Sequence, residues 1–284
     1  MMPAAYYPRT AYFITGTATT TVIQQLQELG FTYPLIAKPD VGGQGRGVKK
    51  LHNEAELVDY ANRSPLDYLV QEFVPQPNEI GVFYFRYPGE AQGHVSGIVR
   101  KQMLSVQGDG HSTMHALLMK DKRFILQIDV LQQLYGDGLQ EVLPAGEIRE
   151  LVPYGNHARG AKFLDDSHLA DAAFTHTIDH ICKQVAGFYY GRLDIRYNTW
   201  QELKEGKNFS VIELNGAGSE PTHMYDPGHS LFFAWKEIVR HWIILWRISR
   251  INHKKGIPYL SHKEGMQMMR DNRVFEQKLQ QLYV

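Results

Sequence analysis

The sequence predicts an α+β protein with two lobes and a helical tail. Residues 78–88 and 93–104 alternate apolar and polar side chains, as two antiparallel strands do. Residues 191–198 and 208–215 form a second pair, a hairpin across the polar loop TWQELKEGK. The first 75 residues instead mix short strands with helices. A chain of 284 residues is long enough for one large domain or two modest domains.

The first 75 residues are expected to form the smaller lobe. Gly30 is expected to stop its first helix, and Asn53 to cap its second helix, with Glu56 at the capping-box position. Pro75 and Pro77 end the last strand of this lobe and mark a hinge near residues 71–79. The expected strands are residues 10–16, 33–39 and 67–74, and the expected helices are residues 19–30 and 53–64.

Residues 76–228 are expected to form the larger lobe, which contains both antiparallel strand pairs. Between the two pairs, residues 108–151 indicate helices and loops, with residues 114–136 as the main helical part. Residues 166–191 predict a further helix, which Gly187 ends.

Residues 229–284 are expected to form a C-terminal helical extension. Its most apolar part, residues 230–249, is expected to bury an apolar stripe on the larger lobe rather than against a twin subunit. A helix lying on a membrane surface is the lesser alternative, because basic and tryptophan residues mix along it. A simple membrane span is excluded by five polar or charged residues, namely Lys236, Glu237, Arg240, His241 and Arg247.

The overall composition predicts a cytoplasmic globular protein. The chain has 30 basic and 30 acidic residues, so no bulk charge recruits nucleic acid or a membrane. A single cysteine, Cys182, excludes an internal disulfide and fits a reducing compartment. The N-terminus has no basic start followed by an apolar run, so we expect no signal peptide.

Residues 34–51, PLIAKPDVGGQGRGVKKL, place a lysine at the end of an apolar strand and four glycines after it. The Lys38 ammonium loses hydration in such a strand unless an anion meets it. Glycines allow backbone amides to approach a phosphate closely. The Walker pattern and the dinucleotide-binding fingerprint are both absent. The segment predicts a phosphate-binding loop of Gly42, Gly43, Gly45 and Gly47; the alternative is a flexible hairpin with a snorkelling lysine.

The hinge carries two glutamates, Glu72 at the end of a strand and Glu79 seven residues later. A strand that leads into a linker exposes backbone donors and acceptors, which suit the edge of an adenine. A carboxylate just beyond it can accept hydrogen bonds from both hydroxyls of a ribose. Taken alone, two glutamates near a turn can also be an ordinary solvated surface.

The hairpin of residues 191–215 carries three oxygen ligands suited to a hard cation. Glu213 and Asn215 lie two residues apart on one strand and share a face, and Asp194 lies on the other strand. Mg²⁺ typically binds a few carboxylates together with substrate phosphates. Arg192 lies two residues from Asp194, so it is placed to hold a phosphoryl oxygen. Solvent-facing hairpin charges are the weaker alternative, because apolar residues surround these positions.

These segments together resemble the ATP-grasp carboxylate–amine ligases, which include D-alanine–D-alanine ligase, glutathione synthase and cyanophycin synthetase. The resemblance runs from about Pro8 to about Pro227 and is strongest in IAKPDVGGQGRGV, VQEFVPQPNE and GRLDIRYN…VIELN. It implies an ATP-grasp fold, with the nucleotide held between two antiparallel sheets. In such proteins a lysine like Lys38 contacts the α- and β-phosphates, a loop like residues 42–47 closes over them, and an arginine like Arg192 steadies the transferring phosphate.

The resemblance also implies the remaining nucleotide and metal contacts. The hinge would meet the adenine at Glu72, Phe73 and Val74, with Ile212 beside the nucleotide, and Glu79 would take the ribose. The metal ligands would be Asp194, Glu213 and Asn215, holding Mg²⁺ or alternatively Mn²⁺.

The reaction that the resemblance implies joins a carboxylate to an amine. ATP phosphorylates a small-molecule or peptide carboxylate, which gives an acyl phosphate and ADP, and an amine, or less often a thiol or hydroxyl, then attacks the acyl carbon. The site must supply cations, because a carboxylate and a triphosphate repel each other. Besides Lys38 and Arg192, we expect Arg100 and Lys101 to serve this purpose. No nucleic acid partner is expected, and a membrane partner is the disfavoured alternative.

Three further loops are compared with substrate elements. The segment GDGHSTMHALL, residues 108–118, is similar to a segment of cyanophycin-synthetase-like proteins, but we favour a turn and helix cap there. Residues 153–163 suit a loop over phosphate or carboxylate, although a solvated loop is the alternative. The third loop is residues 216–220. The expected substrate contacts are Asn156, His157 and Arg159 in the second loop, and Gly216 and Gly218 in the third loop.

Two departures from the family leave the substrate open. Residues 216–220, GAGSE, replace the segment that holds the second substrate in D-alanine ligases, so D-alanine is not expected. Family members also begin with a domain of about a hundred residues, and carry another phosphate-contacting lysine before the segment that opens this chain. No lysine precedes Lys38 here. Three explanations are open: the chain is a fragment, another subunit (of a homodimer or a different protein) completes the pocket, or Arg9 takes the place of the missing lysine.

Two other functions remain open at this stage. One is a nucleotide-binding module or partner-dependent pseudoenzyme without turnover of its own, and the other is a kinase-like transfer to a carboxylate or phosphate. The complete set of Asp194, Glu213 and Asn215 favours the ligase, because a pure binder would not need all three.

Overall fold

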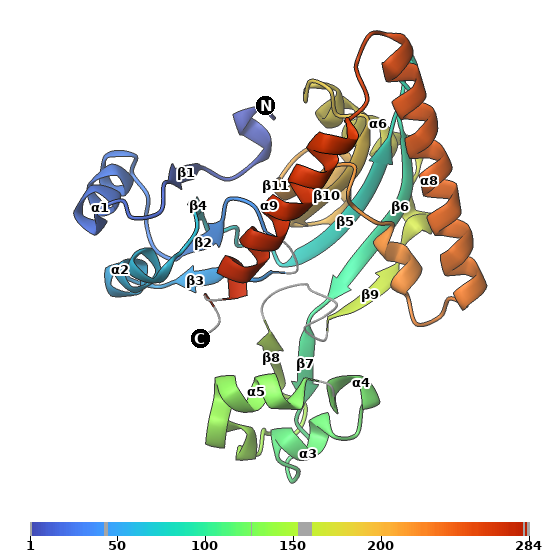
Figure 1. Ribbon diagram of the computed structural model, residues 1–284. Coiled ribbons are helices and arrows are strands. Elements are labelled where there is room, and N and C mark those ends of the chain that lie inside the picture. The colour runs from blue at the N-terminus through green and yellow to red at the C-terminus, as the bar shows by residue number, and fades with distance from the viewer. Residues whose placement is uncertain (1, 43–44, 126, 153–160, 281, 283–284) are drawn as a thin grey trace.

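Two antiparallel sheets form the two lobes of the protein (Figure 1), which confirms the predicted α+β class. The computed structural model describes residues 2–42, 45–125, 127–152, 161–280 and 282. The small lobe contains a four-stranded sheet in the order β1-β4-β2-β3, and the large lobe a five-stranded sheet in the order β11-β10-β5-β6-β9. A third sheet pairs β7 with β8 in a separate insertion.

The small lobe packs two helices on its sheet around a shared apolar core. The Asn53 side chain caps α2 by accepting a hydrogen bond from the Glu56 amide at 3.0 Å, as predicted. The Glu56 carboxylate accepts from the amide of His52, one residue before the cap. The strand β3 was not predicted, because lysines weaken the strand pattern there. The elements are β1 (Thr10–Phe13), α1 (Thr19–Glu28), β2 (Leu35–Pro39), β3 (Lys49–Leu51), α2 (Glu54–Arg63) and β4 (Tyr68–Glu72).

The large-lobe sheet has two faces with different roles. One face buries Ile80, Val82 and Leu193 against α6 (Ala172–Lys183). The other face carries charged side chains at one end and apolar ones at the other. The strands are β5 (Asn78–Phe85), β6 (His94–Gln102), β9 (Lys162–Asp165), β10 (Tyr190–Tyr197) and β11 (Phe209–Asn215).

Two predicted elements of the large lobe differ from the structure. The helix expected over residues 166–191 is α6 alone, because the Asp171 side chain caps it by accepting from the Phe174 amide at 2.8 Å. Gly187, at φ 77°, lies in the turn between α6 and β10 rather than at the helix end. The loop of residues 199–207 contains the short helix α7 (Trp200–Lys204), which starts with a capping box of Thr199 and Glu202.

Residues 104–152 fold around a core of their own and project from the large lobe (Figure 1). The expected turn and helix cap are present: Asp109 accepts hydrogen bonds from the amides of His111 and Ser112, and Thr113 accepts one from the Ala116 amide. The two strands were not predicted. The elements are β7 (Leu104–Gln107), α3 (Met114–Leu118), α4 (Lys122–Ile125), α5 (Ile128–Tyr135) and β8 (Ile148–Val152).

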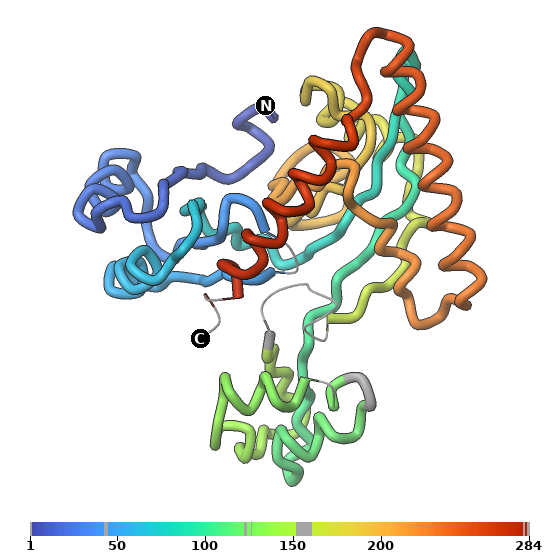
Figure 2. The backbone as a smooth tube through the Cα atoms, viewed as in Figure 1, coloured from blue at the N-terminus to red at the C-terminus, as the bar shows by residue number. Residues whose placement is uncertain are grey.

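The C-terminal extension consists of α8 (Leu231–Lys254) and α9 (His262–Gln280). Ile244 and Ile248 of α8 pack on Phe83 and Phe85 of the large-lobe sheet, as expected for an apolar stripe. Figure 2 shows α9 running back from the end of α8 toward the small lobe. No described helix is long and apolar enough to cross a bilayer. Short 3₁₀ turns occur at Ala4–Tyr6, Gly136–Gln140, Ser167–Leu169 and Thr222–Tyr225.

Candidate active site between the lobes

Lys38 connects the small lobe to the hairpin of the large lobe. It lies near the end of β2, and its Nζ donates to the Ile212 carbonyl of β11 at 3.0 Å and to Gln71 Oε1 at 3.1 Å. Both acceptors are neutral, and no carboxylate among the described residues forms an ion pair with Lys38. Burial lowers the pKa of Lys38, partly opposed by Glu213 and Asp194. A partly buried ammonium thus bridges the two lobes, and both of its hydrogen-bond acceptors are neutral.

The glycine-rich loop follows Lys38 on the small lobe. Gly45 and Gly47 adopt φ values of 65° and 71°, which side chains disfavour. A Cβ on Gly47 would lie 2.8 Å from the Pro39 side chain and 3.0 Å from that of Leu282. Gly42 is exposed, and Gly43 lies outside the described residues. The loop therefore requires glycine at residue 47 for its backbone conformation and for close packing.

The hairpin of β10 and β11 aligns the predicted metal ligands with Arg192. In the strand register Asp194 pairs with Glu213, and Arg192 pairs with Asn215. Asp194 accepts from Arg192 Nε at 2.8 Å through one carboxylate oxygen and from Lys101 Nζ at 2.9 Å through the other. These two cations hold the pKa of Asp194 below its usual value despite its burial. Asp194 is therefore ionised throughout the physiological pH range.

Glu213 and Asn215 lie on the open side of this hairpin. With the Asn215 amide nitrogen oriented toward Glu213, it donates to Glu213 Oε1 at 3.2 Å while its oxygen accepts from Arg192 Nη2 at 3.3 Å. No ion pair involves Glu213 among the described residues. Desolvation by the surrounding protein and the charge of Asp194 raise the pKa of Glu213.

Lys101 joins the hinge to the metal hairpin through a buried ion cluster. Its Nζ donates to Glu79 Oε1 at 2.8 Å and to Asp194 Oδ2 at 2.9 Å, and the three side chains are at most 7% exposed. Although burial alone would lower the pKa of Lys101, the two carboxylates raise it well above the usual range. Arg196 adds a contact to Glu79 Oε2 at 3.3 Å. Both oxygens of Glu79, the expected ribose ligand, thus already accept from cations.

Three residues that contact or closely approach the predicted site residues were not identified from the sequence. Gln71 and Arg196 contact Lys38 and Glu79 respectively, and neither position carried a recognisable motif. Gly81 lies opposite Asp194 in the register, where a Cβ would come within 2.8 Å of Val99 and 3.3 Å of Asp194 Oδ1. A glycine inside an otherwise apolar strand is the signal that indicates such a close approach.

Arg100 does not reach this cluster. It precedes Lys101 on β6, and successive strand residues point to opposite faces of the sheet. Arg100 pairs with Ile80 in the register and forms an ion pair with Asp166 at 2.7 Å. Of the two expected cations of β6, the structure brings only Lys101 to the site.

The hinge residues begin with Glu72, the last residue of β4, and continue into the segment after it. Glu72 forms an ion pair with Arg9, whose guanidinium also donates to the carbonyls of Leu29 and Gly30. Phe73 lies under the Lys50 ammonium at 3.9 Å from its ring centre. The Val74 carbonyl accepts from Arg196 at 3.3 Å, which ties the hinge to the large lobe.

The remaining predicted substrate residues fall into two groups. Asn156, His157 and Arg159 lie outside the described residues. Gly216 and Gly218 lie in the exposed turn after β11, and a Cβ at either position would meet nothing within 4 Å. This turn leaves open space directly beside Asn215.

Among the described residues, no three His, Cys, Asp or Glu side chains gather closely enough to hold a metal ion by themselves. The oxygen donors of Asp194, Glu213 and Asn215 nevertheless suit Mg²⁺, which takes its other ligands from phosphate and water. Asp194 can accept a further contact, because a carboxylate has about four lone-pair sites and its two cations make one contact to Oδ1 and two to Oδ2.

No family model and no curated protein matches the sequence. Solved structures to which the chain is similar include D-alanine–D-alanine ligase from Bacillus anthracis, at 12% identity and a TM-score of 0.49, covering 89% of this chain and 65% of that protein. A bifunctional glutathione synthetase from Pasteurella multocida matches at 13% identity and a TM-score of 0.44, covering 85% and 34%. The ATP-grasp ligase PsnB, solved with a minimal precursor, matches at 14% identity and a TM-score of 0.41, covering 84% and 56%.

The chain therefore spans between 34% and 65% of the length of these three proteins.

Proposed function

We propose that the protein is an ATP- and Mg²⁺-dependent ligase that activates a substrate carboxylate as an acyl phosphate for attack by an amine or similar nucleophile. The proposal rests on the place where the lobes meet: the small lobe contributes a lysine and a glycine loop, and the large lobe contributes paired oxygen ligands and an arginine.

The single observation that carries the proposal is the environment of Lys38. Its ammonium is held by two neutral oxygens at 3.0 and 3.1 Å, and it points toward the β11 segment that carries Glu213. A charge-assisted hydrogen bond to a phosphate is stronger than either neutral contact. Lys38 therefore gains free energy by exchanging these partners for a polyphosphate.

Asp194, Glu213 and Asn215 are the residues that would hold the metal ion. When bound, Mg²⁺ neutralises charge on the outer phosphates of the nucleotide. Arg192 is held in place by Asp194 through contacts at 2.8 and 3.3 Å, so its guanidinium is oriented before a substrate arrives. It is placed to stabilise the charge of a phosphoryl group during transfer.

The chain's other contributions are positioning and exclusion of water. The hinge offers a buried acceptor, Gln76 Oε1, which has no partner among the described residues and suits the amino group of adenine. The glycine loop would cover the phosphates and keep water from the acyl phosphate. The open turn at Gly216 and Gly218 leaves room for the acceptor.

The amine attacks the acyl carbon, and the phosphate leaves with one of the original carboxylate oxygens. The test follows this transfer of an oxygen atom from the carboxylate to the phosphate. Candidate carboxylates labelled with heavy oxygen, taken from the common amino acids and short peptides, are incubated with ATP, Mg²⁺ and amine acceptors. ADP release is measured together with the label in inorganic phosphate.

Acceptor-dependent ADP release with label in the phosphate supports ligation. ADP release without label in the phosphate contradicts the acyl phosphate. Nucleotide binding without ADP release under any condition contradicts the ligase and indicates a binding module.

A further inference from the structure

Helix α8 carries two apolar faces, and the large lobe buries only one of them. The buried face contains His241, Ile244 and Ile248, which pack toward β5 and β10. The opposite face contains five large apolar residues at alternating spacings of three and four, so they form one stripe along the helix. We call it the α8 stripe; its exposed fractions are 77% for Phe232, 54% for Trp235, 53% for Val239, 69% for Trp242 and 57% for Trp246.

The α8 stripe concentrates the tryptophans of the protein. Three of the four tryptophans of the chain lie in it, and the fourth, Trp200, stacks on Phe174 at 4.8 Å in the large lobe. A contiguous exposed apolar patch of this kind marks a binding surface. Tryptophan is enriched where an apolar phase meets water, because its indole has an apolar body and a polar N–H.

Basic residues follow the same helix. Residues 231–255 contain six lysines and arginines and a single carboxylate, Glu237, within a chain whose net charge is zero. Glu237 is buried and already pairs with Arg240 and His223, at 3.0 and 3.2 Å. Among the described residues, no carboxylate pairs with Lys236, Arg247 or Arg250. The helix therefore presents cations whose counter-charge must come from outside it.

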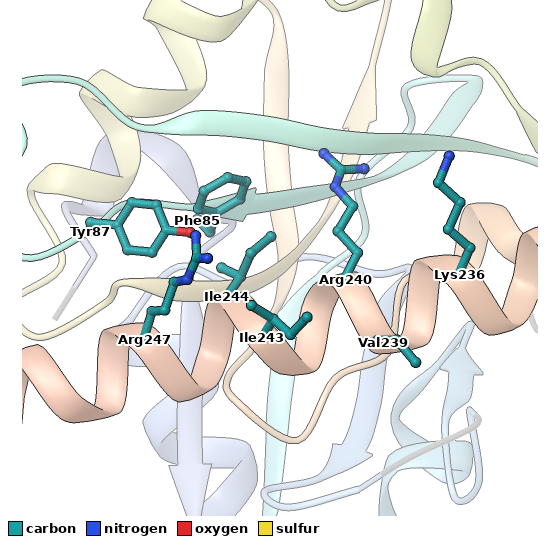
Figure 3. Close-up of a pocket in the computed structure, with 8 residues that line it drawn as sticks. All are labelled: Phe85, Tyr87, Lys236, Val239, Arg240, Ile243, Ile244 and Arg247. Carbon is teal, nitrogen blue, oxygen red and sulfur yellow. The ribbon is translucent and has the colours of Figure 1, made fainter.

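Three of these cations border a groove beside the α8 stripe (Figure 3). Lys236, Arg240 and Arg247 are spaced by four and seven residues, so they lie along one line of the helix. The groove has a volume of about 470 Å³, and Phe85 and Tyr87 of the large lobe form its other wall. A cationic rim over an apolar wall suits an anionic head group with an attached hydrocarbon chain.

A second copy of the chain fits this surface less well. Pairing two α8 stripes would bring the flanking cations of both helices together, with no exposed carboxylate on either helix to neutralise them. An anionic bilayer supplies the missing charge and takes up the tryptophans at its interface.

We propose that the α8 stripe and its flanking cations bind the surface of a bilayer that contains anionic phospholipid. The helix lies in the interface, with the tryptophans at the level of the head groups and the lysine and arginine side chains extended toward the phosphates. This proposal takes up the membrane-surface helix, which was the lesser alternative from the sequence, and it does not depend on the proposed ligase activity.

The test measures binding of the full chain to sedimented phosphatidylcholine vesicles with and without phosphatidylserine. The expected result is binding to the anionic vesicles that weakens as salt is added, with a blue shift of tryptophan fluorescence and quenching by brominated lipid. Equal binding to both vesicle types, or no binding to either, would overturn the proposal.

Matched variants assign the binding to α8. The double variant Trp242→Ser/Trp246→Ser is expected to weaken vesicle binding about 100-fold. The triple variant Lys236→Gln/Arg247→Gln/Arg250→Gln is also expected to weaken it about 100-fold. The control Leu134→Ser removes a residue of 63% exposure from α5 and should leave binding unchanged.

Circular dichroism establishes whether each variant is folded. If the tryptophan variant unfolds, the charge variant tests the proposal, because it leaves the apolar surface intact. Unchanged vesicle binding in a folded variant contradicts the proposal. A concentration-dependent dimer of the parent that is seen by sedimentation and is lost in the tryptophan variant would also contradict the proposal, because a second copy would then occupy the α8 stripe.

Discussion

The two halves of the candidate active site are held in place by different kinds of contact. In the large lobe, Lys101, Asp194 and Glu79 form a buried ion cluster on three adjacent strands. In the small lobe, Lys38 contacts only neutral oxygens, and the glycine loop is tied by Arg46 to Glu276 of α9 at 2.6 Å. The large-lobe half is therefore organised by folding itself, whereas Lys38 has partners weak enough to exchange for a ligand.

This difference predicts where substitutions affect stability and where they affect function. Changes in the ion cluster should lower the free energy of unfolding, because they leave buried charges without partners. Changes at Lys38 and at the exposed Glu213 should leave the fold intact and affect ligand binding or turnover.

The largest effect is expected for Lys101→Met, which keeps side-chain volume but removes the charge between Glu79 and Asp194. The free energy of unfolding should fall by about 3 kcal/mol, because removing one partner strands buried carboxylates. Denaturation in urea measures it. Arg100→Met is the matched control: Arg100 is the neighbouring residue with a 48% exposed side chain, so its loss should cost less than about 1 kcal/mol. Equal losses in both variants would show that the cluster contributes no more than a surface ion pair.

The next effect is expected for Glu213→Gln, which removes one charged oxygen ligand from the hairpin. Magnesium-dependent ADP release should fall on the order of 100-fold, while the melting temperature stays within error of the parent. Glu205→Gln, an exposed carboxylate before β11, should keep full activity. Unchanged turnover in Glu213→Gln would remove the metal assignment.

A smaller effect is expected for Lys38→Ala. Calorimetric titration with a non-hydrolysable ATP analogue and Mg²⁺ should give an affinity about 30-fold weaker, which corresponds to one charge-assisted hydrogen bond. Lys49→Ala removes another small-lobe lysine, which pairs with Asp59 at 3.1 Å, and should bind like the parent. If Lys38→Ala also bound like the parent, the proposed phosphate contact would be wrong.

The smallest effect is expected from pH and concerns the packing of α8 on the large lobe. Burial lowers the pKa of His223 and of His241 below the usual 6.5. His241 lies on the buried face of α8 and contacts Ser96, and His223 contacts Glu237 of the same helix. Because the pKa values of these two histidines are lower in the folded state, the unfolded state binds more protons as the pH falls below about 6.5, so acidification favours the unfolded state. The melting temperature should therefore fall from pH 7 to pH 5.5, and less steeply in His241→Gln. A parent whose melting temperature is constant over this range would contradict the assignment.

Local sequence patterns predicted most of the strands and helices but missed those whose residues lack a local preference. The strands β2, β5 and β10 follow apolar runs, and α2 follows its Asn53 cap. The strand β3 contains two lysines and exists because it pairs with β2. The strands β7 and β8 likewise form around a core made by helices between them. Tertiary pairing determined these strands, and no local periodicity could reveal them.

The same division between local sequence pattern and tertiary contact applies to the candidate active site. The spacing of Arg192 and Asp194 on one strand, and of Glu213 and Asn215 on the next, was enough to predict that these side chains share a face. The partners of Lys101 could not be predicted, because Glu79 and Asp194 lie on other strands, 22 and 93 residues away. The separation of Arg100 from the site followed only from the register of β6 against β5.

The sequence by itself determined the α+β class and the residue types that the candidate site contains, because periodicity, caps and glycines act over a few neighbouring residues. Only the tertiary structure decided which charges meet, that Lys38 faces neutral oxygens, and that α8 leaves its tryptophan face exposed. These three features depend on strand register and helix packing, which bring together residues far apart in the chain. Register and packing are set by the free energy of the whole fold.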